Sequence, residues 1–145
     1  MRDVSSPSPE QVEYAGLLKR LAAGDLVVCR KLVHDTEVED HAIGFHAQQS
    51  VEKALKVALV LAGVELPYSH DLELLVDLVK GSGIELPADL TSPEWLTPWA
   101  VDLRYGEPTA LDRAAALAVA ESAVSWAAAR LAAASPSVPQ VDSHE

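Results

Sequence analysis

The chain has 145 residues, a length that suits a single domain, and 49% of them are hydrophobic, which is enough to build a core. Its 22 acidic residues outnumber the 11 basic ones, and the formal charge of −11 disfavours a broad nucleic-acid-binding surface. Cys29 is the only cysteine, so an intrachain disulfide is excluded, and its apolar neighbours favour a small core residue over a nucleophile.

Alanine and leucine are abundant while aromatic residues make up 5%, and this composition favours helices over strands. The polar ends predict disorder in residues 1–8 and 135–145, which leaves residues 9–134 for a helical domain. The start is unlike a signal peptide, no apolar run is long and charge-free enough to span a membrane, and no Cys/His cluster has zinc spacing. We therefore expect a cytoplasmic protein with no metal, cofactor or membrane contact.

The first predicted helix begins at Ser8 and Pro9, a cap followed by a first-turn proline. Asp25 lies on its apolar stripe, where a carboxylate needs a partner, and Gly24 beside it weakens the helix and could kink it. The apolar residues that recur at helical spacing are Tyr14, Leu18, Leu21, Val28 and Leu32.

After a charged turn at residues 34–40, a second helix is predicted over residues 39–62, with Gly63 as its C-cap. Glu52 falls at the edge of the buried face of this helix, between a glutamine and leucines. An unpaired carboxylate there would cost several kcal/mol, so we expect Glu52 to be paired. The sequence leaves its partner open, and the candidates are Arg104, His70 and a lysine across the bundle.

A third helix is predicted with Ser69 as its cap and Asp71 in its first turn, and it stops at residues 81–83. Residues 89–103 predict a shorter helix interrupted by two prolines, and Pro108 opens the last helix. The broad apolar face of that helix holds Leu111, Ala114, Leu117, Ala118, Val124, Ala128 and Leu131. Helices joined by short loops predict an all-α fold, a four- to five-helix up-and-down bundle.

A row of polar residues follows the second helix at steps of three and four. An ordinary amphipathic helix would explain the row, with a boundary histidine and an exposed Glu52–Lys56 pair worth about 0.3–0.5 kcal/mol. That explanation does not account for the closeness of so many polar residues to the apolar stripe. The row holds His46, Gln49, Lys53 and Lys56, and Gln48 and Glu52 lie in the neighbouring row.

Two further clusters combine basic, polar and turn residues. His70 lies at a helix start, where the cluster either caps the helix or lets His70 project into a cleft near helix amides that could hold an anion. Arg104 and Tyr105 end the fourth segment. The Arg104 guanidinium either interacts favourably with the negative end of the helix dipole or points at a phosphate or a buried carboxylate.

Taken together, these clusters resemble the HEPN domain family, in a branch with a histidine–alanine–glutamine helix. The matching stretches are GDL at 24–26, FHAQQSVEKALK at 45–56, SHDL at 69–72 and LRYG at 103–106, in the order and spacing of the family. The resemblance runs from about residue 12 to residue 131. The residues that it carries over are Asp25, His46, Gln49, Glu52, Lys53, His70, Asp71, Arg104 and Tyr105.

The resemblance implies a small helical bundle that commonly forms homodimers and that binds a nucleotide or RNA. It also implies a minimal nucleotidyltransferase as partner, with which many members act as toxin and antitoxin. Ribonuclease branches of the family carry an arginine followed after four to six residues by a histidine. In this chain no histidine follows Arg104 until His144, so the ribonuclease pair is missing.

Three hypotheses follow. The first is a non-catalytic protein that binds a nucleotide or a partner nucleotidyltransferase, with the carried-over residues forming a ligand site or a polar network that fixes helix register. The second is a metal-independent ribonuclease with a relocated site, in which His46 or His70 is the base and Arg104 binds phosphate. The third is a purely structural interaction module.

Overall fold

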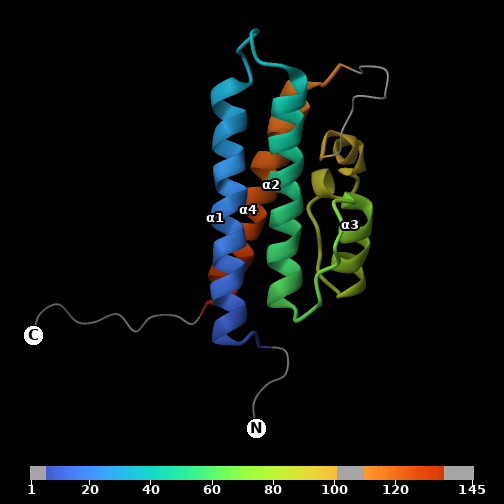
Figure 1. Cartoon of the computed structure of the whole chain (residues 1–145). Helices are drawn as coiled ribbons and strands as arrows, with labels where there is room; N and C mark the ends of the chain where they lie inside the picture. The colour runs from blue at the N-terminus through green and yellow to red at the C-terminus, as the bar shows by residue number, and fades with distance from the viewer. Residues whose placement is uncertain (1–5, 101–109, 136–145) are drawn as a thin grey trace, which may run out of the picture.

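The computed structural model describes residues 6–100 and 110–135, and in these ranges the chain is all-α, as predicted. Four α-helices and two short 3-10 helices make up the described elements (Figure 1). The predicted disordered ends lie largely outside the described residues. The elements are α1 Pro9–Leu32, α2 Asp40–Leu61, α3 Leu72–Gly81, η1 Ala88–Leu90, η2 Glu94–Ala100 and α4 Arg113–Ala134.

Three long helices, α1, α2 and α4, lie side by side, and α3 with the 3-10 helices packs on the other side of α2 (Figure 1). α1 and α2 are antiparallel, as their short connection requires. The colours show that α2, α3 and α4 all run the same way. The connectors, residues 62–71 and 82–87 among them, carry the chain back along the bundle between these helices. The helices therefore do not simply alternate in direction.

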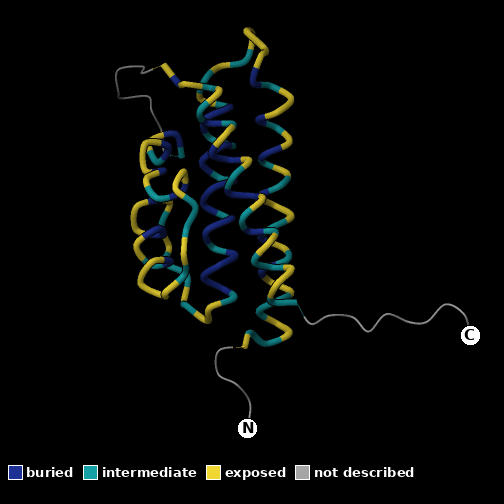
Figure 2. The backbone as a smooth tube through the Cα atoms, turned by 180° about the vertical axis from the view of Figure 1, so that it is seen from behind, coloured by how far each residue is buried: buried dark blue, intermediate teal, exposed yellow. Residues whose placement is uncertain are grey.

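α2 is the central helix of the bundle, in contact with α1, α3, α4 and η2. Its second half is buried on nearly every side, and Leu55 and Leu59 are fully buried (Figure 2). Alanines on the facing helices allow the close approach, because a methyl group adds little width between two helix axes. Any polar side chain on α2 therefore lies close to the core and has to find a protein partner.

The predicted apolar stripe of α1 was wrong in part, although Leu18 is buried as predicted. Tyr14 and Leu21 are 47% and 46% exposed, and the buried stripe lies one position further along the helix. Alanines hold several of the inward positions, so the larger side chains were a poor guide to the buried face. The helix continues through Gly24 without interruption. The buried residues of α1 are Ala15, Leu18, Ala22, Leu26 and Cys29.

The predicted ends of α1 and α2 are confirmed. Ser8 caps α1 in a capping box with Gln11, in which each side chain accepts a hydrogen bond from the other residue's backbone N–H. The turn between α1 and α2 spans residues 33–39. Gly63, after the C-cap of α2, has a φ of +75°, a left-handed conformation that glycine adopts without strain.

Two predicted helix starts were wrong. Asp71, not Ser69, is the N-cap of α3, because its carboxylate accepts from the amides of Glu73 and Leu74. Asp112 caps α4, several residues after the predicted start at Pro108, which lies outside the described residues. On α4 the predicted inward residues Ala114 and Ala118 are exposed, whereas Ala116, Val119, Ala120, Ala123, Val124 and Ala127 are buried.

The predicted helix at residues 89–103 consists of two 3-10 helices up to residue 100, because the prolines interrupt regular hydrogen bonding. The η2 segment is fixed at two points. Trp99 lies flat on Gly44 of α2, where an added Cβ would come within 2.6 Å of the indole. The hydroxyl of Thr97 accepts a hydrogen bond from the Leu72 amide at 3.1 Å and so caps the start of α3.

Arg113, at the start of α4, fixes the turn between α1 and α2 through hydrogen bonds. Its Nε donates to Asp40 Oδ1 at 2.7 Å, and the Leu111 amide donates to the other oxygen of Asp40 at 3.0 Å. These two hydrogen bonds, the backbone one first, lower the pKa of Asp40. The rest of the guanidinium donates to the backbone carbonyls of Leu32, Val33, Asp35 and Val38.

By length and composition alone, α4 is the one helix in the described part of the chain that could cross a membrane. This differs from the expectation that no apolar run would be long enough. The same helix packs on both α1 and α2 and contributes six residues to the buried core. That packing is typical of the core helix of a bundle.

Candidate functional site

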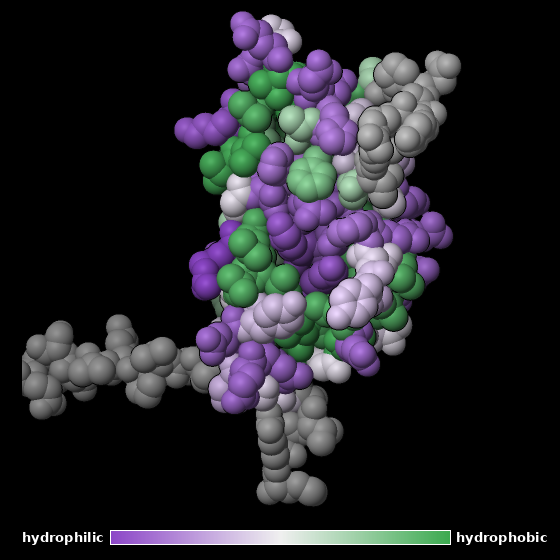
Figure 3. Space-filling model, viewed as in Figure 1, coloured by the Kyte–Doolittle hydropathy of each residue, from purple (hydrophilic) through white to green (hydrophobic). Residues whose placement is uncertain are grey.

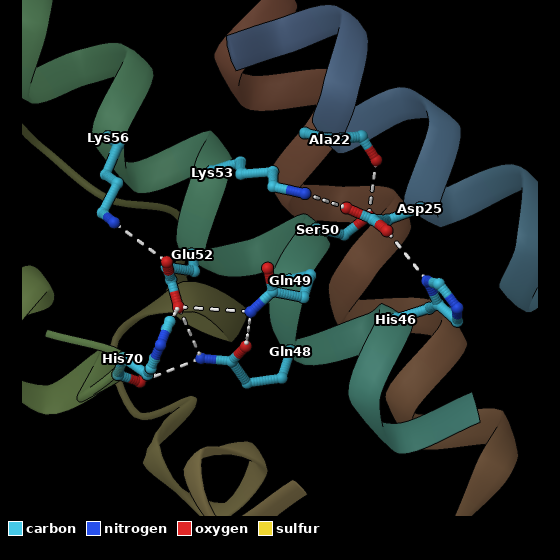
Figure 4. Close-up of polar contacts among 10 residues, drawn as sticks. All are labelled: Ala22, Asp25, His46, Gln48, Gln49, Ser50, Glu52, Lys53, Lys56 and His70. Atoms are coloured by element: carbon cyan, nitrogen blue, oxygen red, sulfur yellow. Dashed lines mark hydrogen bonds and ion pairs between the residues drawn. The ribbon is translucent and has the colours of Figure 1, made fainter. Parts of the chain in front are cut away.

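Two carboxylates organise the polar residues of α2, and each is paired with one histidine and one lysine (Figure 4). Asp25 comes from α1 and Glu52 from α2. In each case a histidine Nδ1 lies on one carboxylate oxygen and a lysine ammonium on the other. We call the surrounding group the polar face: Asp25, His46, Gln48, Gln49, Glu52, Lys53, Lys56 and His70.

Asp25 joins α1 to α2, and the prediction that it needs a partner is confirmed. His46 Nδ1 lies 2.8 Å from its Oδ1, and Lys53 Nζ lies 2.7 Å from its Oδ2. The Phe45 ring meets the His46 ring edge to face, with centroids 5.3 Å apart, and helps to hold the imidazole in place. The carboxylate is therefore held by two residues, on opposite sides, from one helix.

A second polar link fixes the two helices close to Asp25. Ser50 is fully buried, and its hydroxyl donates to the backbone carbonyl of Ala22 at 2.6 Å. This carbonyl belongs to a helical turn of α1 that precedes Asp25. The hydrogen bond sets the register of α2 against α1, so the histidine and lysine positions on α2 come opposite Asp25.

Glu52 is the buried member of the pair, with 4% of its side chain exposed. Its Oε1 lies 2.8 Å from His70 Nδ1, and its Oε2 accepts from Lys56 Nζ at 2.9 Å. Of the predicted partners, His70 is confirmed, and Arg104 is outside the described residues. The lysine is Lys56 of the same helix, so the prediction of a lysine across the bundle was wrong. The Glu52–Lys56 pair is largely buried, not exposed as the amphipathic interpretation required.

Burial by itself would raise the pKa of Glu52, but hydrogen bonds from Lys56, His70 and Gln48 outweigh it and lower the pKa below its ordinary value of 4.5. Glu52 is therefore ionised at neutral pH and can only accept. The His70 Nδ1 must carry the hydrogen of the shared hydrogen bond. In the neutral ring this leaves Nε2 as an acceptor on the outward edge.

The polar face has an inner layer, which consists of Glu52 and the two glutamines, Gln48 and Gln49. Gln48 is fully buried, and its Nε2 donates to the His70 carbonyl at 2.9 Å and to Glu52 at 3.1 Å. Gln49 Nε2 donates to Gln48 Oε1 at 2.7 Å. The list of predicted site residues omitted Gln48, although its position four residues before Glu52 on the same helix face is a signal for such a bond.

The outer layer of the polar face reaches solvent. The His70 side chain is 60% exposed and that of His46 31% exposed. The space-filling view shows hydrophilic atoms gathered at the middle of this face (Figure 3). Tyr68, two residues before His70 in the chain, is fully exposed. The polar face therefore presents imidazoles over a buried layer of paired groups.

The other predicted site residues lie elsewhere. Asp71 caps α3 through backbone amides and has no described contact with the polar face. Arg104 and Tyr105 lie outside the described residues. His46 and His70 are held by separate carboxylates at the two ends of the network (Figure 4). Among residues 6–100 and 110–135, no three His, Cys, Asp or Glu side chains are grouped so that they could hold a metal ion.

Cys29 is a buried core residue, as predicted. Its Sγ lies 3.6 Å from the Ile43 carbonyl oxygen, where the thiol can donate a weak hydrogen bond. Burial, with the nearby charge of Asp25, raises the pKa of the thiol to about 11. The thiolate is therefore scarce at neutral pH, and Cys29 is unsuited to nucleophilic chemistry.

The comparison with known protein families agrees with the resemblance found in the motifs. The family model described as HEPN domain matches residues 16–131, which includes α1 from its third turn, all of α2 and α3, and nearly all of α4. No curated protein and no solved structure matches the chain. The match covers most of the sequence and every residue of the polar face, and the chain therefore belongs to the HEPN domain family.

Proposed function

We propose that this HEPN-family chain is a non-catalytic binding protein whose polar face holds the phosphate groups of a nucleotide. The observation that carries the proposal is the orientation of the two histidines. Each uses Nδ1 to reach a carboxylate, and within the described residues neither Nε2 has a hydrogen-bond partner. In the protonated imidazole Nε2 carries a hydrogen as well, and such an outward N–H is a donor of the kind that binds phosphate oxygens.

The charge balance of the polar face fits an anionic ligand of moderate affinity. Asp25 and Glu52 are matched by Lys53 and Lys56, so the face is neutral while the histidines are neutral. The whole chain carries −11, and this local balance removes the repulsion that an acidic surface would exert on phosphate.

The inner layer has a different task from the outer one. Glu52 and Gln48 are buried and bonded to protein groups, so they fix the positions of α2 and the segment before α3. This supports a structural role for the inner layer. Ligand binding is assigned only to the outward nitrogens of His46 and His70.

A second use of the same face is favoured by Tyr68, which is fully exposed beside His70. Exposed tyrosines are enriched in protein interfaces. We propose a minimal nucleotidyltransferase as this partner, in a toxin–antitoxin pair of the kind that the family resemblance implies. Co-expression of the two proteins tests it: Tyr68→Ala should reduce the amount of enzyme that co-purifies, and equal recovery with both chains would count against it.

Titration calorimetry with ATP and with GTP tests the nucleotide proposal. His70→Asn keeps an amide donor near the Nδ1 position, facing Glu52, and removes Nε2, so the fold should survive while binding weakens about tenfold, the effect of losing one charge-assisted hydrogen bond. Lys80→Ala, an exposed lysine of α3, is the matched control. Absence of binding by the native chain, or equal affinity for His70→Asn and the native chain, would contradict the proposal.

The non-catalytic part of the proposal has its own test. Incubation of the purified chain with a mixed-sequence RNA should leave the RNA intact, because the arginine–histidine pair of the ribonuclease branches is missing. Cleavage that disappears in both His70→Ala and Arg104→Ala, with helical content unchanged, would instead establish the relocated ribonuclease site.

A further inference from the structure

A cavity lies at the end of the bundle where α1 begins and where α2 and α4 both end (Figure 1). Its volume of about 890 Å³ is within the range of about 300–1,000 Å³ that is usual for small-molecule sites. We call it the end pocket. Its lining comes from the segment just before α1, the last turns of α2 and α4, and Ile84, and it shares no residue with the polar face.

The walls of the end pocket are mostly apolar. Leu61, Ile84 and Trp126 line it, and each of them packs against the core but remains partly exposed. Alanines of α2 and α4 form most of the remaining wall, and their methyl groups leave space open between the helix ends. A ligand with an apolar body would remove this wall from water, which is favourable.

Arg130 is the only charged residue among those that line the end pocket. Its guanidinium lies over the Trp126 ring, 5.7 Å from the ring centroid, and this contact gives its N–H groups no hydrogen-bond acceptor. In residues 6–100 and 110–135, Nε of Arg130 is the one buried side-chain nitrogen or oxygen that has no hydrogen-bond partner. Because a buried donor without an acceptor is unfavourable, this arginine is suited to a ligand that supplies one.

The charge of the end pocket is complementary to a single carboxylate. The chain has 22 acidic residues and 11 basic ones, yet no carboxylate is among the residues that line this pocket. A guanidinium can donate from Nε and one Nη to the two oxygens of one carboxylate. Apolar walls strengthen such a pair, because the attraction between opposite charges is less screened there than in water.

We propose that the end pocket binds a small monocarboxylate with an apolar body, of the medium-chain fatty-acid class. The carboxylate accepts hydrogen bonds from Arg130, whose flexible side chain can turn Nε toward the ligand, and the hydrocarbon chain lies against Leu61, Ile84 and Trp126. Both parts of the ligand are required, because the pocket offers one charge and an apolar wall. A nucleotide fits it poorly, since a triphosphate carries several charges and the pocket has one cation.

Titration calorimetry with octanoate tests the proposal. The native chain should bind octanoate at one saturable site and should bind acetate and octanol at least about tenfold more weakly, because each lacks one of the two parts. Absence of saturable octanoate binding, or binding of octanol as tight as that of octanoate, would overturn the proposal.

Arg130→Met removes the charge and keeps a long side chain, so it should weaken octanoate binding about tenfold and leave octanol binding unchanged. Arg20→Met, at an exposed arginine of α1, is the matched control, because it removes the same charge from the chain outside the pocket. Equal octanoate affinity of these two variants would show that Arg130 does not hold the carboxylate.

A pair of variants on α4 tests the place of binding. Ala129 and Ala132 are both exposed, but only Ala129 lines the end pocket. Ala129→Phe should fill part of the pocket and weaken octanoate binding about tenfold, whereas Ala132→Phe should bind as the native chain does. Thermal melts of both variants should match the native chain. Native octanoate affinity in Ala129→Phe would place the ligand elsewhere and contradict the proposal.

Binding in the end pocket does not depend on nucleotide binding by the polar face. His70→Asn should therefore leave the octanoate affinity unchanged, and saturating ATP should not displace octanoate. Competition between the two ligands would place octanoate on the polar face and would contradict the proposal. Either proposal can therefore fail while the other holds.

Discussion

Glu52 illustrates how one buried carboxylate can set the local structure. It accepts hydrogen bonds from Lys56, His70 and Gln48, and these bonds outweigh the cost of burial. The bond from His70 also ties the segment before α3 to the middle of α2. Removing the charge would leave donors facing one another in a place from which water is excluded, and such groups are costly to leave unpaired.

The first prediction concerns that charge. Glu52→Gln should lower the free energy of unfolding by about 2–4 kcal/mol at neutral pH, because the new amide turns a donor toward Lys56 or His70. Urea denaturation followed by circular dichroism measures the change. Glu65→Gln, at an exposed position in a connector, is the control and should change stability by less than about 0.5 kcal/mol. Equal stability of the two variants would contradict the assigned role.

The second prediction is a pH dependence with a definite sign. Glu52 has a folded pKa below its ordinary value of 4.5, and Asp40 one below 3.8, so protons bind the unfolded chain more readily. The stability from both groups is present above the unfolded pKa and is lost as pH falls through the folded pKa. The urea midpoint should therefore fall as pH drops below 4.5, less steeply in Glu52→Gln; an unchanged slope in the variant would contradict it.

At the residue scale, the sequence predicted that Asp25 and Glu52 need partners, because a carboxylate on an apolar helix face cannot remain alone. It named no partner for Asp25, and for Glu52 it left His70 as one of three candidates. The lysine of Glu52 comes from the same helix, but His70 approaches through a connector whose path depends on how α3 packs on α2. Gln48 was not predicted as a site residue, because its amide is uncharged and, unlike a carboxylate, does not indicate that a partner is needed.

At the scale of elements, individual side-chain contacts determine where the irregular segments lie. The η2 segment is held to α2 by the Trp99 indole on Gly44 and to α3 by Thr97. The sequence predicted a helical segment over residues 89–103 but not the position of η2, because that position comes from packing of a large ring on a glycine far away in the sequence. The displaced stripe of α1 has a similar cause: Ala15 and Ala22 pack inward while the larger Tyr14 and Leu21 lie outward, so side-chain size was a poor guide to the buried face.

The third prediction tests the Trp99–Gly44 contact. Gly44→Ala would place a methyl group within 2.6–2.8 Å of the indole, so the ring must move, at a cost of about 1–3 kcal/mol. Gly81→Ala, where the added methyl would meet nothing within 4 Å, is the control. Thermal melts and tryptophan fluorescence should show a less stable protein with a red-shifted spectrum only for Gly44→Ala. A normal spectrum and melting temperature would show that Trp99 packs elsewhere.

The fourth prediction concerns the fastening of α4. Arg113→Lys keeps the charge and loses the forked geometry that serves Asp40 and the carbonyls of the α1–α2 turn, so it should destabilise the fold by about 1–2 kcal/mol. Asp40→Asn should cost a similar amount, and the double variant less than the sum of the two, since the residues share a contact. Strict additivity in denaturation experiments would contradict this coupling.

At the scale of the whole molecule, all-α class and family membership could be predicted from composition and motif order, and both are confirmed. The direction of the helices could not, because α2, α3 and α4 all run the same way and their connectors make the return passes. The polar face is built across this arrangement, from α1, α2 and the connector before α3. Its chemistry is a property of the assembled bundle, not of any single motif.

The central claim, that the outward nitrogens of His46 and His70 bind a nucleotide's phosphates, is tested most directly by nitrogen-15 NMR of the five imidazole rings during titration with ATP. Before addition, the spectra should show both rings with the hydrogen on Nδ1 whenever they are neutral. ATP should then shift the Nε2 signals of His46 and His70 and leave those of His34, His41 and His144 in place. Unchanged signals from His46 and His70 at saturating ATP would contradict the account.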